Sequence, residues 1–402
     1  MRHLLALIRQ NGNLLLFGFF LTCFSGFGQT FFVSLFVPYI QKYFQVSDSL
    51  FSSFYAIATL MSAATLTWAG RFIDTVRLPR FTIRVMLGLA ISLIFLSQSY
   101  FFPMLIVGLF GIRLFGQGLM THTSLTSMGK FFDIDRGKAI SIAALGHPAG
   151  EAIFPIVFVS LITAIGWRYS LVVAGLLVFM LIPVVLYILF KRNQYSKLKL
   201  FLPTPKKSEA DLKASKPWNV LKSKAFLILA PSNFASASIG TAFIFFQLKI
   251  GAERGWSPTW MAGSFVAFAI AGATGSIVGG LLTDRFSAKK MYPIILLPFL
   301  MGLTAFYFID SPWVYPLFLA GIGMTNGFSN TVKNSALAEM YGIAFLGSVR
   351  SVFITVMIFS TAIGPVLFGS LFDLGFSFHQ LILFSIFAMI LTSINSLRIF
   401  RM

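Results

Sequence analysis

Two charged residues, Arg113 and Glu151, lie deep within long apolar stretches of the sequence. An ionisable group at the centre of a bilayer costs at least about 2.5–3.5 kcal/mol, so each should face a partner or a watery cavity. At about 1.5 Å per helical residue, Arg113 lies about 15 Å from the outer end of its stretch, and Glu151 lies at a similar depth in the next one. We expect a buried pair in which protonation of Glu151 frees Arg113 for an anionic group. The alternative is a static ion pair that orients two helices.

His147 precedes Glu151 by four residues, which places both on one face of a helix. Histidine titrates near neutral pH, so a His147–Glu151 relay is one way to couple proton movement. A histidine that donates one bond to a neighbouring carbonyl is the equally weighted alternative. His122, near the inner end of the preceding stretch, is expected to be interfacial or structural.

Polar residues mark three of the apolar stretches. Gln29 follows a Gly-x-Gly sequence, and Gln117 lies between two glycines. Either glutamine could hydrogen-bond a substrate or join two helices, and Gln29 is the better candidate. A later stretch carries a polar stripe at spacings of three, four and seven, which suits the lining of a pathway: Asn326, Asn330, Lys333 and Asn334. Lys333 could instead extend to the cytoplasmic headgroups.

The composition indicates what holds these residues. Hydrophobic residues make up 57% of the chain and charged residues 11%, against roughly 45–50% and 25% in soluble domains. Apolar runs of about 20 residues, enough to cross a bilayer, recur along the chain. We therefore predict an all-α integral membrane protein with twelve spans: 14–40, 50–69, 81–99, 103–127, 139–165, 170–190, 225–248, 258–282, 291–308, 313–336, 347–372 and 378–399.

The charges predict how the chain is oriented. The formal net charge is +19, and most of the 31 Lys and Arg gather at the N-terminus, in alternate loops and at the C-terminus. The opposite loops hold only Lys42, Arg168, Lys249 and Arg254. This bias places both termini in the cytoplasm, with the bacterial inner membrane as the expected location. Attraction of the basic loops to membrane lipid explains the charge, so nucleic acid is not an expected partner.

A polar segment divides the predicted spans into two sets. Residues 191–224 contain ten cations, two acids and three prolines, too polar a composition for a bilayer. We predict a six-helix bundle at 1–190, a cytoplasmic basic linker at 191–224 and a second six-helix bundle at 225–402. The apolar run after residues 2–10 is too long for a signal-peptide core. Cys23 is the single cysteine, which excludes an intrachain disulfide.

One loop of the chain is written twice. Gly70 and Asp74 recur 210 positions later as Gly280 and Asp284, and cations follow each aspartate. With this repeat, the twelve spans and the basic linker, the chain resembles the major facilitator superfamily along nearly its whole length. The resemblance implies two pseudo-symmetric six-helix bundles, with spans 1, 4, 7 and 10 around a central cavity.

The signature loop of that family reads Gly-x-x-x-Asp-Arg/Lys-x-Gly-Arg-Arg/Lys. Arg285 fits the position after the aspartate, whereas Thr75 does not, and Arg77 and Ser287 replace the second glycine. Residues 130–139, 144–150 and 364–373 look like the monocarboxylate and oxalate/formate transporter branch. In this comparison His147 replaces a small residue, and Glu151 is an additional acid.

The family resemblance also implies a cytoplasmic gate. The loop aspartate would approach the start of span 11, which a helix dipole favours, and the loop cations would meet acids below span 4. Here Asp74 would approach the helix that begins near Gly347, and Arg71 or Arg77 would pair with an acid below span 4. The full set of gate candidates is Asp74, Arg71, Arg77, Asp133, Asp135, Asp284 and Arg285.

No enzyme motif accompanies these features. The sequence lacks a P-loop and a Cys/His cluster with metal spacing, so we expect no enzyme, no cofactor and no metal. We predict a secondary active transporter of a small organic anion such as a carboxylate, moved with protons or by exchange. The expected partners are this substrate, protons and membrane lipid, and the expected state is a monomer.

Two other functions stay open on the sequence. A proton-driven exporter of an amphipathic drug or siderophore would use the Phe-rich lining and the acid in span 5. A membrane sensor that transports nothing is the third possibility, and the lack of a sizeable soluble domain argues against it.

Overall fold

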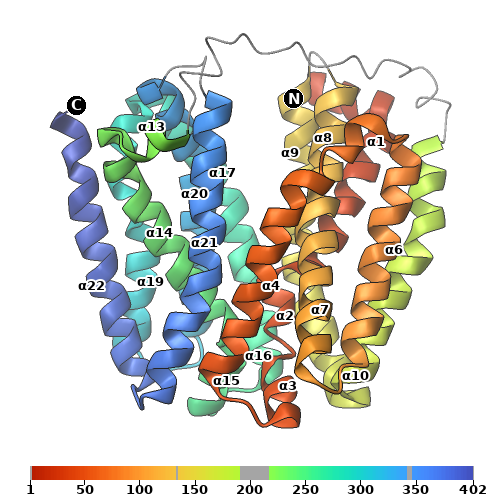
Figure 1. Cartoon of the computed structure of the whole chain (residues 1–402). Helices are drawn as coiled ribbons and strands as arrows, with labels where there is room; N and C mark the ends of the chain where they lie inside the picture. The colour runs from red at the N-terminus through yellow and green to blue at the C-terminus, as the bar shows by residue number, and fades with distance from the viewer. Residues whose placement is uncertain (1, 133–134, 191–216, 342–345, 402) are drawn as a thin grey trace. The chain divides into compact units, whose positions relative to one another are not determined.

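The computed structural model describes residues 2–132, 135–190, 217–341 and 346–401, and every element in these ranges is a helix (Figure 1). Each of the twelve predicted spans coincides with one or more of these helices. The expectation of an all-α membrane protein is therefore confirmed. Asp133 and most of the predicted linker, 191–216, lie outside the described residues.

The chain separates into two units, Met1–Phe44 with Ile57–Thr204 and Gln45–Ala56 with Pro205–Met402. Helix α4 (Asp48–Ala69) is divided between them, so its first turns belong to the second unit. The other elements of the first unit are α1 (Arg2–Phe24), η1 (Ser25–Gly28), α2 (Thr30–Val33), α3 (Val37–Phe44), α5 (Phe72–Thr75), α6 (Leu78–Ser97), α7 (Phe102–Ile112), η2 (Arg113–Met120), α8 (Thr121–Phe131), α9 (Arg136–Ala144) and α10 (Gly146–Phe190).

The second unit is built from the later helices. Within it α14 contacts α21 and α22, and α20 contacts α17 and α19. Its elements are α13 (Pro217–Leu221), α14 (Lys224–Phe245), α15 (Gln247–Glu253), α16 (Pro258–Gly263), α17 (Phe265–Phe286), α18 (Ala288–Met291), η4 (Tyr292–Ile294), α19 (Leu297–Phe308), α20 (Val314–Tyr341), α21 (Leu346–Asp373), α22 (Phe378–Ser396) and η5 (Leu397–Arg401).

Ten stretches of the described chain are long and apolar enough to cross a membrane. The longest, Arg136–Phe190, contains the two predicted spans 139–165 and 170–190. Gly166 interrupts it with φ +81° and ψ +162°, a conformation that an L side chain rarely adopts. α20 is not among the ten, although it has 28 residues, because its asparagines and Lys333 lower its hydropathy.

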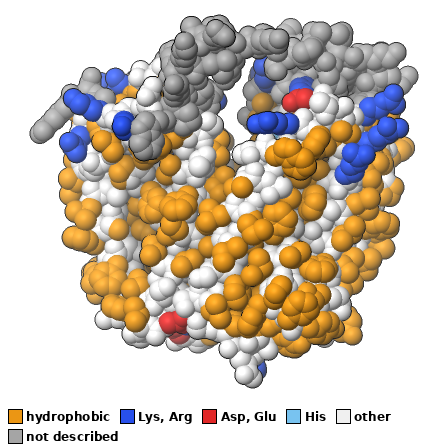
Figure 2. Space-filling model, viewed as in Figure 1, with side chains coloured by type: hydrophobic (Ala, Val, Ile, Leu, Met, Phe, Trp, Pro, Cys, Tyr) orange, Lys and Arg blue, Asp and Glu red, His pale blue; other side chains and the backbone are white. Residues whose placement is uncertain are grey.

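Apolar side chains cover much of the visible surface, and the Lys and Arg of each unit gather towards one end of its helices (Figure 2). On α17, for example, Ile277 and Leu281 are 66% and 67% exposed. Such extensive exposure of large apolar groups is unfavourable in water and natural in lipid. The surface thus agrees with the hydropathy of the sequence.

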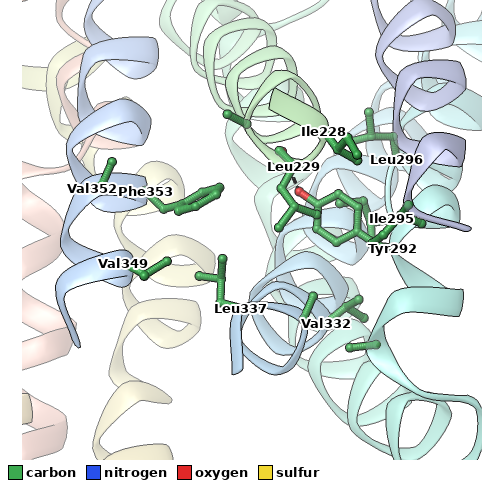
Figure 3. Packing of buried hydrophobic residues seen from close by; sticks show 14 of the residues in the cluster. Ile228, Leu229, Tyr292, Ile295, Leu296, Val332, Leu337, Val349, Val352 and Phe353 are labelled. Atoms are coloured by element: carbon green, nitrogen blue, oxygen red, sulfur yellow. Dashed lines mark hydrogen bonds between the residues drawn. The ribbon is translucent and has the colours of Figure 1, made fainter. Parts of the chain in front are cut away.

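A core of buried residues holds the cytoplasmic-predicted end of the second unit together (Figure 3). Leu229 on α14, Val332 on α20 and Phe353 on α21 contribute to it. The Tyr292 hydroxyl donates to the Leu229 carbonyl oxygen at 2.7 Å and accepts from the Asn233 amide at 2.6 Å. The buried hydroxyl is therefore satisfied, as stable packing requires.

Candidate functional site

Span 1 is broken near its middle. α1 ends at Phe24, the 3₁₀ turn η1 follows, and Gln29 is extended with φ −84° and ψ +159° before α2 begins at Thr30. The Gln29 backbone N–H donates to the Gly26 carbonyl oxygen at 2.9 Å. Discontinuous membrane helices are where transporters form sites, because backbone groups leave the helical ladder there. Gln29 thus occupies the break itself.

Span 4 is irregular in a different way. Between α7 and α8 the chain forms a π-helix, η2, which includes both Arg113 and Gln117. π-Helical segments are rare in proteins, and those that occur are often found at functional sites. Leu119 and Met120 are buried in η2, whereas Gln117 keeps partial exposure. The π-helix η2 thus contains a buried guanidinium, that of Arg113, and a partly exposed side-chain amide, that of Gln117.

The two irregular segments pack directly on each other. A Cβ atom at Gly28 would lie 2.3 Å from the Ile112 carbonyl oxygen and 2.4 Å from the backbone nitrogen of Gln117, so only glycine allows this approach. Arg113 is 1% exposed, and its Nη1 donates to the Gly28 carbonyl oxygen at 3.0 Å. The break in span 1 consequently supplies an acceptor for a cation of span 4.

Glu151 lies on α10 beside the same break. Three residues further along α10, the Phe154 ring stacks on Phe27 of η1 with centroids 4.5 Å apart. Residues three apart share a helix face, so Glu151 is near η1. Nevertheless, no ion pair or hydrogen bond among the described residues joins Glu151 to Arg113 or to His147. The Arg113–Glu151 pair and the His147–Glu151 relay therefore stay predictions.

The predicted polar stripe forms one side of α20 in the second unit. Asn326, Asn330 and Asn334 are exposed, Lys333 is half-buried, and the Asn334 amide donates to the Asn330 carbonyl oxygen at 2.7 Å. Other positions of α20 contact α17, where Thr331 donates to the Ser276 carbonyl oxygen at 3.3 Å. An asparagine row facing lipid would leave amide donors unsatisfied, so the stripe is suited to water or a solute.

The loop acids of the first unit form ion pairs with lysines of the same unit. Asp74 forms an ion pair with Lys130 at the end of α8, and Asp135 pairs with Lys138 at 2.7 Å. No ion pair between Asp135 and Arg71 or Arg77 occurs among the described residues, and the alternative partner, Asp133, lies outside them. The approach of Asp74 to the start of α21 stays a prediction.

The repeated loop of the second unit is held from α20. The Glu339 carboxylate accepts from the Ala288 and Lys289 amides at 2.9 and 3.2 Å, at the start of α18. Arg285 lies over the Phe286 ring, 5.1 Å from its centroid, and Asp284 has no ion-pair partner within the described ranges. Glu339 was missed on the sequence, although it is the one acid at the end of the polar stripe.

His122 confirms its structural interpretation. Its Nε2 lies 3.2 Å from the Gly70 carbonyl oxygen, and its Nδ1 lies 3.5 Å from the Thr126 hydroxyl. The ring therefore joins the first residue of the repeated loop to α8.

Three of the four cations in the opposite loops have specific partners. Lys249 forms an ion pair with Asp48, and Arg254 pairs with Asp310 at 2.7 Å. Arg168 donates to the Ser97 and Ser99 carbonyl oxygens, the latter at 2.9 Å. Aromatic rings surround its guanidinium: Tyr43, Tyr100 and Trp167. These partners are distant in sequence, which is why the sequence did not identify them.

Comparison with known proteins identifies the fold. The Major Facilitator Superfamily matches residues 18–267 and 232–401. No curated protein sequence matches the chain. A bacterial homolog to the human lysosomal transporter Spinster is 14% identical, with a TM-score of 0.74 and 97% of each chain covered. The nucleoside transporter NupG is 12% identical, with a TM-score of 0.75 and 98% of this chain and 99% of the other covered.

Both structures share the fold of this chain, but their sequence identities are too low to indicate its substrate. The family match covers nearly the whole chain, including both halves of the predicted repeat. It confirms the family suggested by the loop at Gly70 and Gly280, whereas the monocarboxylate and oxalate/formate branch stays a prediction. The chain belongs to the major facilitator superfamily.

Proposed function

We propose that this chain is a secondary active transporter that moves a small organic anion, such as a carboxylate, by alternating access. The observation that supports it most is the position of Arg113. This cation is buried where the broken span 1 meets the π-helical span 4, and its Nη1 donates to the Gly28 carbonyl oxygen. A guanidinium offers five N–H donors, so one buried beside a break in a membrane helix is suited to bind a carboxylate through charge-assisted hydrogen bonds.

The neighbouring residues fit the same role. Gln29 and Gln117 each keep partial exposure beside Arg113 and can donate amide hydrogens to a carboxylate. Glu151, close to η1, is the proposed proton carrier, with His147 one turn away. Because a charged carboxylate in a span is costly without a counter-ion, Glu151 is suited to bind and release a proton during transport.

The second unit contributes the polar stripe of α20 to the proposed pathway. Asn326, Asn330 and Lys333 would face the solute during the cycle, and alternating access would come from rocking of the two units. The repeated loops would gate the cytoplasmic side. The protein would lie in a bacterial inner membrane, with both termini in the cytoplasm. Proton coupling and exchange are both compatible with this arrangement.

The relatives of known structure support the transport class and leave the cargo open. One is described as a nucleoside transporter and the other as a homolog of a lysosomal transporter. Nothing in the described residues favours the exporter of amphipathic compounds. We therefore propose the organic anion alone, on the charge of Arg113 and its polar neighbours.

A thermal-shift screen of the purified protein tests this proposal. The probes are oxalate, formate, lactate and pyruvate, with uridine and tetraphenylphosphonium as contrasting compounds. A bound ligand raises the melting temperature, so we expect at least one organic anion to do so. This shift should vanish in Arg113→Gln and persist in Arg254→Gln, whose cation lies outside the proposed site. Stabilisation by uridine or tetraphenylphosphonium and by none of the anions would reject the anion assignment.

A further inference from the structure

One face of α6 carries two arginines followed by apolar residues. Arg80 and Arg84 are exposed and lie four residues apart near the start of the helix. Further along α6, Leu87 is partly exposed and Ile91 is 63% exposed. Residues spaced by three and four lie on one side of a helix, so these four residues form a single face. This face changes from cationic to apolar along the length of α6.

The other side of α6 packs inside the first unit. Val85, Leu89 and Leu93 are buried, and α6 contacts α7 and α10. Residues 78–97 form one of the stretches that are long and apolar enough to cross a membrane. An exposed apolar residue such as Ile91 is natural in lipid and unfavourable in water. The face that includes Arg80 and Arg84 is therefore suited to meet lipid.

The second copy of the repeat shows what the fold requires on this face. The offset of 210 residues that relates the two loops also relates Arg84 to Ile294. Ile294 is 43% exposed, and Leu297 and Met301, which follow it at the same spacings, are 50% and 64% exposed. The corresponding face is thus exposed in both copies, with an apolar residue in place of Arg84 in the second. The fold itself does not need a cation at Arg84, so its charge requires another explanation.

The described protein does not neutralise these two arginines. Among the residues that the structure describes, the side chains of Arg80 and Arg84 form no ion pair and no hydrogen bond. Lys130 and Lys138 of the same unit, in contrast, each pair with an acid. A guanidinium stays charged at physiological pH, and a charge at the edge of the hydrocarbon needs a counter-charge. The phosphate of a phospholipid can supply this counter-charge.

The order of charged and apolar residues along α6 matches a phospholipid. Arg84 and Ile91 are seven positions apart, which is about 10 Å along the helix axis. Long arginine side chains extend towards the headgroups, and arginine binds phosphate through two parallel N–H donors. A phosphate held by the arginines would place an acyl chain beside Leu87 and Ile91.

We propose that Arg80 and Arg84 bind the phosphate of an anionic phospholipid whose acyl chain lies along the exposed face of α6. Two guanidiniums favour a headgroup with net negative charge over a zwitterionic one. This site differs from the general attraction of basic loops to the membrane, because Arg84 lies within the helix and above a defined apolar face. The proposal is independent of the transported cargo.

Lipid binding in native mass spectrometry tests this site. The purified protein in a neutral detergent is titrated with dioleoyl phosphatidylglycerol, and separately with dioleoyl phosphatidylcholine, which has the same chains and no net charge. We expect tighter binding of phosphatidylglycerol. Arg80→Gln with Arg84→Gln should weaken it by about fivefold for each arginine removed. Binding of phosphatidylcholine should change little, so the ratio of the two affinities separates a lost site from altered folding.

Arg9→Gln with Arg398→Gln is the matched control, because it removes two exposed arginines from other elements. This control should bind phosphatidylglycerol as the parent does. An unchanged affinity in the α6 variant, equal weakening in the control, or displacement of the lipid by excess inorganic phosphate would overturn the proposal. Should the α6 variant not fold, Ile294→Arg decides, since it places a second arginine four residues after Lys290. One additional bound phosphatidylglycerol would support the site, and none would overturn it.

Discussion

Arg113 donates to the carbonyl oxygen of Gly28, and Glu151 is left without an ion pair among the described residues. The sequence predicts a similar depth for both residues by counting along the helices, and this depth stays a prediction. It could not predict the partner of Arg113. That acceptor exists only because span 1 leaves the helical conformation at Gly28, and hydropathy carries no information on such a break.

Gly28→Ala tests the close approach of span 1 and span 4. The added methyl group would overlap the Ile112 carbonyl oxygen, and overpacking of this kind costs about 1–3 kcal/mol. We expect a lower melting temperature in detergent and a lower yield of folded protein. Gly263→Ala is the control, because nothing lies within 4 Å of a Cβ atom there. Equal melting temperatures for the two variants would contradict the packing described.

Glu151→Gln tests the proposed proton carrier. The amide has nearly the same shape but binds no proton, so the variant should exchange substrate across proteoliposomes while losing accumulation driven by a pH gradient. Asp310→Asn, which alters an acid outside the spans, should retain both activities. If Glu151→Gln still accumulates substrate with the pH gradient as the parent does, Glu151 is not the coupling residue.

The elements were predictable where burial in lipid determines them. All twelve spans coincide with helices, because about 20 apolar residues in lipid leave the backbone no other way to satisfy its amides. The irregular elements were not predicted. Glycines flank Gln29 and Gln117, yet glycine in a span is as common in straight packed helices as in breaks and π-helices. The π-helical hydrogen bonds of η2 depend on how the segment packs against its neighbours, which the sequence of the segment does not show.

The stripe of α20 makes an element-scale prediction. If Asn326 and Asn330 face a watery pathway, Asn326→Leu with Asn330→Leu should reduce transport while the protein stays folded, because apolar groups replace solute contacts. If the stripe faces lipid, the same double variant should raise the melting temperature and leave transport intact. A matched double variant of exposed residues on α17, Ile277→Val with Leu281→Val, should change neither property.

At the end of α15, Glu253 predicts a pH dependence. Desolvation raises the pKa of Glu253 above its ordinary value of 4.5, Asp48 adds to the rise, and Lys249 and Arg254 oppose it. The folded state then binds this proton more tightly than the unfolded state, so stability falls as the pH rises from about 4.5 through the raised pKa. Glu253→Gln should melt higher than the parent at pH 7, with the difference closing in acid. A lower melting temperature at pH 7 would show that attraction to Lys249 dominates instead.

At the scale of the whole molecule, the repeated loop and the charge bias were enough to predict the family, which the match over residues 18–267 and 232–401 confirms. Long-range pairs were beyond the sequence. Asp48 and Lys249 are separated by 201 positions, and nothing in either loop indicates the other. The first turns of α4 are grouped with the second unit, and the division into bundles at 1–190 and 225–402 stays a prediction.

Anion counterflow in proteoliposomes tests the central claim most directly. Vesicles are loaded with whichever organic anion gives the largest thermal shift, and uptake of the labelled anion is followed for the parent, Arg113→Gln and Arg254→Gln. The account predicts counterflow in the parent and in Arg254→Gln, and its loss in Arg113→Gln at an unchanged melting temperature. Full counterflow in folded Arg113→Gln would contradict the assignment of Arg113 as the residue that binds the transported anion.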